Sequence, residues 1–277
     1  MIKKSQKHAD TIYKLAEIED SEINIANAAL NIGRLDYPSV DLNSYQKHLD
    51  EIAKTLEQQI KERNSLNHLI KEINYTLFDL YNYRGDIKNY NDPQNANIIR
   101  VIDRRIGLPV ILGILYIHAM RSTGWSAEGL AFPGHFLIRL QVRQHRAIID
   151  PFDKGKILNT TQLRFLLKKV MGKSFELKPS YYDSVSNKDI LLRVLNNLKS
   201  RAFSLNDTDR VIQVQRRMTT LAPNIPDLWR DLGLFESDKG NIKNAMDAFQ
   251  IFADKCVNTQ ERMTAIGMIN QLKRKLH

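Results

Sequence analysis

Residues 104–120 read RRIGLPVILGILYIHAM. After a glycine and a proline, this stretch is apolar almost all the way round from Val110 to Met120, which is typical of a helix that other elements enclose on every side. We therefore predict that a buried helix starts near Pro109, ends at residues 122–124 and forms the core of its domain.

Two later stretches read FPGHFL at residues 132–137 and IIDPF at residues 148–152. Their apolar and polar residues alternate with a period of two, so we predict two strands, one carrying His135 and the other Asp150. If a two-residue turn at residues 143–144 joins these strands, the two side chains share one side of the sheet as diagonal neighbours at ~7–8 Å. A modest bend would then allow them to form a hydrogen bond.

An aspartate that accepts a hydrogen bond from one ring nitrogen fixes the histidine tautomer and leaves the other nitrogen as a base, as in enzymes that activate a Cys or Ser. A cysteine enzyme of this type also needs a thiol at the N-terminus of the facing helix, where the helix dipole favours the thiolate. Here that helix opens with four residues that cannot attack a substrate, namely Gly107, Leu108, Pro109 and Val110. The single cysteine, Cys256, lies far along the chain, and we expect it to be a packing residue. The sequence therefore predicts a remnant catalytic pair, His135 and Asp150, without a nucleophile.

Other roles for these residues stay open at this point. His135 can be paired with Asp150 for stability alone, and Asp150 can instead pair with Arg139 or cap the turn that follows it. For His118, in the apolar helix, a hydrogen-bonded core position is the simpler interpretation. The neighbouring Arg104 and Arg105 are typical of a solvated helix end, from which they could contact an acidic partner.

The composition sets broad limits on function. The chain has 277 residues, 43% hydrophobic and 26% charged, with a formal net charge of +10. This suits a globular protein of one large and one smaller domain, or of two domains of similar size. The seven histidines show no short metal-ligand spacing, and no phosphate-binding glycine loop is present, so we expect no metal and no cofactor. With no apolar run long enough to cross a bilayer and no signal peptide, we expect a cytoplasmic protein without a membrane partner.

Helical periodicity dominates both ends of the chain. It covers residues 8–31, 45–60 and 66–80, and resumes without any strand signal from about residue 187 onward. In that last region four residues match the tetratricopeptide pattern, in which small residues let two helices approach and large ones fill the groove: Trp229, Gly233, Ala245 and Phe249. Leucines that precede this unit by the repeat period of about 34 residues indicate a weaker repeat before it.

Four runs, taken in order, carry a family resemblance. These are YNDPQNA at residues 90–96, RRIGLP at 104–109, PGHFL at 133–137 and DPF at 150–152. Together they resemble the bacterial transglutaminase-like family with C-terminal tetratricopeptide repeats, the SirB-type proteins. The resemblance implies a papain-like transglutaminase core in which His135 and Asp150 occupy the places of the catalytic His and Asp, although no cysteine opens the core helix.

We therefore predict an α+β protein. A helix-rich transglutaminase-like core with a small antiparallel sheet occupies residues 1–182, and an all-α tetratricopeptide-like domain occupies residues 183–277. The predicted function is non-catalytic binding of a protein or peptide, through the repeats and the cleft at His135. The alternative is a hydrolase or acyl-transfer enzyme that uses His135 and Asp150 without a covalent cysteine step. The basic charge also leaves nucleic-acid binding open, as an alternative that we do not favour because no aromatic-interleaved basic motif is present.

Overall fold

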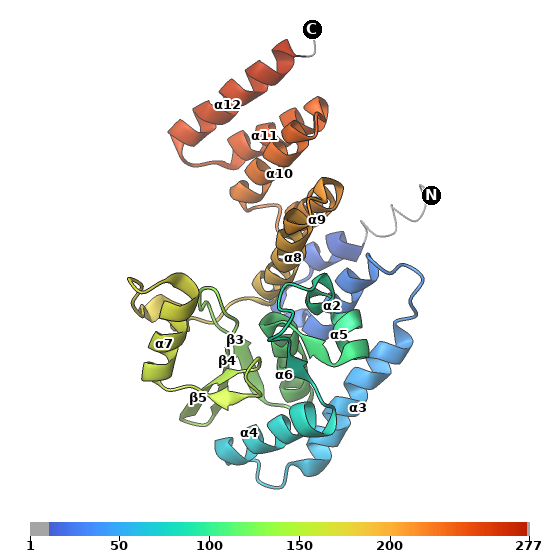
Figure 1. Cartoon of the computed structure of the whole chain (residues 1–277), viewed down its shortest axis with the longest axis vertical. Helices are drawn as coiled ribbons and strands as arrows, with labels where there is room; N and C mark the ends of the chain where they lie inside the picture. The colour runs from blue at the N-terminus through green and yellow to red at the C-terminus, as the bar shows by residue number, and fades with distance from the viewer. Residues whose placement is uncertain (1–10, 276–277) are drawn as a thin grey trace. The chain divides into compact units, whose positions relative to one another are not determined.

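The structure is a computed structural model, in which residues 11–275 are described (Figure 1). The predicted start of the first helix at residue 8 and the N-terminal segment considered as a signal peptide lie outside these residues. The chain divides into one unit over Asp20–Val194 and a second that combines the described parts of Met1–Glu19 and Leu195–His277. The division expected after residue 182 stays a prediction.

The first unit is mostly helical. Its helices are α2 (Ile25–Arg34), α3 (Asn43–Gln59), α4 (Leu66–Asn74), α5 (Ile98–Arg104), α6 (Pro109–Ser122) and α7 (Thr160–Met171), and α8 (Asn187–Ser204) begins in it. Four of them start at a residue whose side chain accepts a hydrogen bond from the first turn: Asn24, Ser65, Asn97 and Asn159. Such caps satisfy backbone N–H groups that have no partner within the helix, which explains why the helices begin at these residues.

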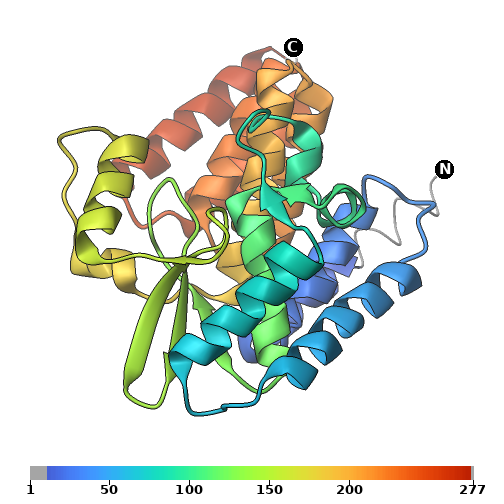
Figure 2. The same cartoon turned by 60° about the horizontal axis from the view of Figure 1, so that its bottom comes forward.

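Helix α6 is the centre of this unit, as predicted. Every residue from Pro109 to Met120 is buried, and the proline occupies the first turn, where its missing N–H costs nothing. The helix contacts α2, α3, α4 and strand β3. Figure 2 shows it, in green, enclosed between the blue and cyan helices and the yellow-green sheet. Neighbours on every side explain the lack of a polar face in its sequence.

A four-stranded antiparallel sheet packs beside α6. Its order is β3 (Ser126–Gly129), β4 (Ile138–Val142), β5 (His145–Asp150) and β6 (Lys156–Ile157). A two-residue turn joins β4 to β5, with Ile138 opposite Ile149, so the predicted turn and register are confirmed. Arg143 in this turn has a φ of 53°, a conformation that glycine or asparagine would adopt more readily. The sequence did not predict a second, parallel pair, β1 (Arg84–Gly85) with β2 (Ile106–Gly107), whose strands are too short to show a period.

The second unit contains only helices among its described residues: 11–17, the end of α8, α9 (Thr208–Leu221), α10 (Pro226–Asp238), α11 (Ile242–Lys255) and α12 (Thr259–Arg274). The predicted small-to-large packing is present, because a Cβ added to Gly233 on α10 would lie 2.6 Å from the Phe249 ring on α11. Glu236 is 1% exposed, and its carboxylate accepts hydrogen bonds from Arg216 and Asn241. The α+β prediction is thus confirmed, with strands in the first unit and helices in the second.

Candidate functional site

The start of α6 is closed by packing. Leu108 is fully buried and its N–H donates to the carbonyl of Asn95, while a Cβ added to Gly107 would lie 2.8 Å from Val101 Cγ1. None of residues 107–110 carries a hydroxyl or a thiol. The unit over Asp20–Val194 contains no cysteine, because the single cysteine, Cys256, follows α11 in the other unit.

His135 and Asp150 form the predicted pair. His135 Nε2 lies 2.9 Å from Asp150 Oδ1, and both side chains are largely buried. Asp150 is the last residue of β5, as expected. The prediction that His135 lies within a strand is wrong, because β4 starts three residues later, at Ile138, and His135 belongs to the bend before it. The bend has the alternating apolar pattern of a strand because its apolar residues are also buried in the core, and this pattern led to the wrong prediction.

The hydrogen bonds of Asp150 define the tautomer of the histidine. Asp150 Oδ1 also accepts from the backbone N–H groups of Phe152, at 2.9 Å, and Asp153, at 3.4 Å. This carboxylate therefore pairs with His135 and caps the turn at once, whereas Arg139 pairs with Glu128 instead. Since the carboxylate accepts, His135 Nε2 carries the proton and Nδ1 of the neutral ring has a free lone pair. Within residues 11–275, no hydrogen bond to Nδ1 is present.

Arg193 holds the bend that carries His135, and the sequence did not point to it. Its guanidinium donates to the carbonyls of Phe132, at 3.2 Å, and His135, at 2.7 Å, and lies 5.5 Å from the centre of the Phe136 ring. Burial lowers the pKa of Arg193 from its ordinary value. In the sequence, Arg193 is only an arginine within the helix predicted after residue 187. Its contact with the bend is visible only in the tertiary structure.

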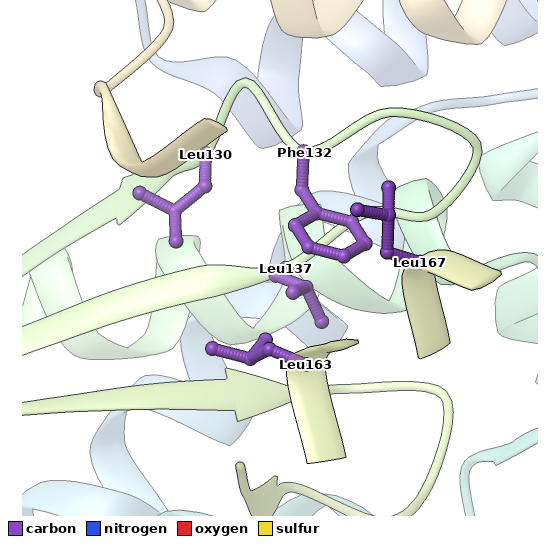
Figure 3. Close-up of a cluster of buried hydrophobic side chains, with 5 residues drawn as sticks. All are labelled: Leu130, Phe132, Leu137, Leu163 and Leu167. Carbon is purple, nitrogen blue, oxygen red and sulfur yellow. The ribbon is translucent and has the colours of Figure 1, made fainter. Parts of the chain in front are cut away.

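A small apolar cluster sets the position of α7 beside the same bend. Figure 3 shows its five buried side chains, two from α7 and three from the segment before β4: Leu130, Phe132, Leu137, Leu163 and Leu167. Because Phe132 and Leu137 flank His135 in the chain, this packing fixes the distance between the bend and the helix. Complete burial of one such side chain contributes about 1.5–3 kcal/mol to the stability of the fold.

A pocket of about 960 Å³ lies between α7, the bend and the loop after β1. His135 and Asp150 are among the residues that line it, and the Phe152 ring lies 6.1 Å from the His135 ring and edge-on to it. Thr161, Phe165 and Lys169 of α7 line one wall, and Ile87 and Tyr90 line another. Residues 107–110 are not among the residues that line it. The pair can thus meet a ligand, but the start of α6 offers that ligand no reactive atom.

The remaining sequence candidates are structural. His118 is buried in the core as expected, and burial lowers its pKa, but its Nε2 has no hydrogen-bond partner within the described residues, so the expected hydrogen bonding is incomplete. The expectation that Arg104 and Arg105 form a solvated helix end is wrong. Arg104 donates to Asp92 and Asn95, and Arg105 donates to the Tyr83 hydroxyl.

Residues 11–275 contain no group of three or more His, Cys, Asp or Glu side chains that could hold a metal ion. In the same part of the chain, every helix is too short or too polar to cross a membrane.

Comparison with known proteins places this geometry in a family. The model of the transglutaminase-like superfamily matches residues 43–196, and that of the tetratricopeptide repeat matches residues 198–270. A UPF0162 protein of Xylella fastidiosa is 31% identical over 234 residues, which cover 83% of each chain. F-box only protein 21 of Mus musculus is 29% identical over 149 residues, covering 51% of this chain and 23% of that one. The solved structure of menin aligns with 96% of this chain and 74% of its own, at 9% identity and a TM-score of 0.42. The two family models and the UPF0162 relative confirm the family resemblance that the four sequence runs indicated.

Proposed function

Because this chain belongs to the transglutaminase-like superfamily and carries tetratricopeptide repeats after that domain, we propose that it is a protein-binding scaffold or regulator that performs no thiol chemistry. The observation that carries the proposal is the segment that leads into α6, where Gly107, Leu108, Pro109 and Val110 are all buried and none has a reactive side chain. A covalent mechanism needs a nucleophile within hydrogen-bond reach of its base, at about 2.6–3.2 Å. The only bond of the His135 ring within the described residues is to Asp150.

The repeats supply the second support. Stacked helix pairs of this kind generally form an extended concave surface that binds a peptide or a helix. We propose that the second unit recruits a partner in this way, in a reducing, cytoplasmic compartment where the thiol of Cys256 stays unpaired. Neither a metal nor a cofactor has a part in this proposal.

One observation favours a second candidate. His135 lines the pocket, Asp150 holds Nε2, and no residue in the described part of the chain bonds to Nδ1, which is the arrangement of a general base. The pair could then activate a water molecule or a nucleophile that the substrate itself carries, without a covalent enzyme intermediate.

A measurement of enzymatic activity distinguishes the scaffold from the enzyme. The purified full chain is incubated with glutamine-containing peptides, with and without a fluorescent primary amine, and the release of ammonia, peptide cleavage and amine incorporation are measured. The proposed function predicts no activity above the level of the His135→Ala protein. If any of these activities is clear in the natural chain and absent in the variant, the chain is an enzyme and the scaffold proposal is refuted.

A further inference from the structure

The pocket above His135 has exposed apolar walls. Phe165 on α7 is 71% exposed and Ile87 on the opposite loop is 82% exposed. Single exposed apolar side chains are ordinary on a protein surface. Here, however, they converge on one concavity, together with Tyr90 and Val170, which is typical of a binding site.

The charged residues that line the same pocket are two aspartates, Asp150 and Asp153, and two lysines, Lys156 and Lys169, and of these only Lys169 has no partner within the described residues. Helix α7 contains Arg164, Lys168 and Lys169 and no acidic residue. The first two pair with Glu176, whereas Lys169 lines the pocket and has no ion pair with any residue in the described part of the chain. Lys156 also lines the pocket and lies 3.4 Å from Asp153, a surface pair that water weakens.

The third feature is the free nitrogen of His135. Asp150 occupies Nε2, so in the neutral form of the ring Nδ1 is a hydrogen-bond acceptor, and His135 is among the residues that line the pocket. A peptide N–H is a donor of matching chemistry, and every residue of a peptide except proline carries one.

We infer that this pocket binds an acidic peptide segment of a partner protein, with one bulky apolar side chain as its anchor. The anchor packs against Phe165, a carboxylate of the segment faces Lys169, and a backbone N–H donates to Nδ1 of His135. The inference rests on the proposed function and names the chemistry of a partner for the first unit. An anionic membrane surface would use the same charges, but a concave site is better suited to a single inserted side chain.

The test measures binding of the full chain to three pools of short fluorescent peptides by anisotropy. One pool has a central Phe or Leu between glutamates, the second has glutamine in place of glutamate, and the third has alanine in place of the anchor. We expect the first pool to bind most tightly. Phe165→Ala should weaken it about tenfold and Lys169→Gln about threefold, as burial of an aromatic ring and a surface ion pair predict.

Two variants match these substitutions outside the pocket. Phe203→Ala removes another exposed ring, 65% exposed in the second unit, and Lys173→Gln removes a lysine just after α7 that does not line the pocket. Neither should change the affinity by more than about twofold.

Several results would overturn the inference. These are equal binding of the glutamate and glutamine pools, no binding of any pool, or binding to phosphatidylserine vesicles in place of peptides. Loss of peptide binding in Phe203→Ala but not in Phe165→Ala would also overturn it, while leaving the proposed function intact, because the repeats would then be the binding site. Cleavage or cross-linking of the peptides that disappears in His135→Ala would instead refute the proposed function.

Discussion

Replacing Asp150 by alanine tests whether this carboxylate organises the site. Its Oδ1 accepts from His135 Nε2 at 2.9 Å and from the N–H of Phe152 at 2.9 Å, with a longer contact from Asp153. A hydrogen bond to a charged acceptor contributes about 1.5–3 kcal/mol, and the cap of the turn contributes about 1 kcal/mol. We therefore expect Asp150→Ala to lower the free energy of unfolding of the first unit by about 2.5–4 kcal/mol.

Asp150→Asn keeps the shape of the side chain and one acceptor oxygen but removes the charge. About half of the stabilisation should remain, so the expected loss is about 1–2 kcal/mol. The matched control is Asp153→Asn, three residues along the same turn. That side chain is 62% exposed and makes one surface ion pair, so its loss should cost at most about 0.5 kcal/mol.

Urea unfolding followed by tryptophan fluorescence gives these free energies. The chain has two tryptophans, Trp125 in the first unit and Trp229 in the second. In a Trp229→Phe background, the signal of Trp125 reports the unit that contains Asp150. The reasoning is refuted if Asp150→Ala costs less than about 1 kcal/mol, or if Asp153→Asn costs as much as Asp150→Ala.

Two further predictions concern other parts of the first unit. Burial, and then the charge of Arg105, lower the pKa of His48 from 6.5 to about 4. The unfolded chain takes up this proton near pH 6.5 and the folded chain only near pH 4, so the free energy of unfolding should fall by about 1–2 kcal/mol as the pH drops through that range, after allowance for partial exposure. Urea titrations across this range should show the loss in the natural chain and a flatter profile in His48→Gln. Gly113→Ala would place a Cβ 2.4 Å from the Phe136 ring and should destabilise the unit by about 1–3 kcal/mol, whereas Gly267→Ala, with open space in helix α12, should stabilise the second unit by about 0.5–1 kcal/mol. Equal effects of the two substitutions would contradict the packing described for α6.

Helix α6 and the register of β4 with β5 were predictable because each depends on a periodic pattern. An unbroken apolar run of the length of a helix has few structural solutions, and a two-residue turn permits one register. The repeats were predictable for a similar reason, since the positions of small and large residues around Trp229 specify how the helices pack.

The bend that carries His135 was not predictable in this way. Phe132, Phe136 and Leu137 are buried, so the bend has the apolar content of a strand, and only the contact with Arg193 shows how its backbone carbonyls are satisfied. That contact joins positions about sixty residues apart in the chain, and local sequence patterns carry no information at that range. The same limit applies to the pocket, whose walls come from three separate segments.

The contacts of the pair explain why its geometry alone does not define an enzyme. Asp150 caps the turn after β5 whether or not His135 reacts, and Arg193 binds the carbonyl of His135 and not its ring. Both contacts therefore stabilise the fold, and they would keep the histidine in place in a protein that only binds. Residues 107–110 carry no thiol or hydroxyl and do not line the pocket that His135 lines, so the start of α6 supplies no nucleophile to the pair. In the binding role that we propose, Nδ1 would accept a hydrogen bond from a ligand in a pocket that apolar side chains and Lys169 line.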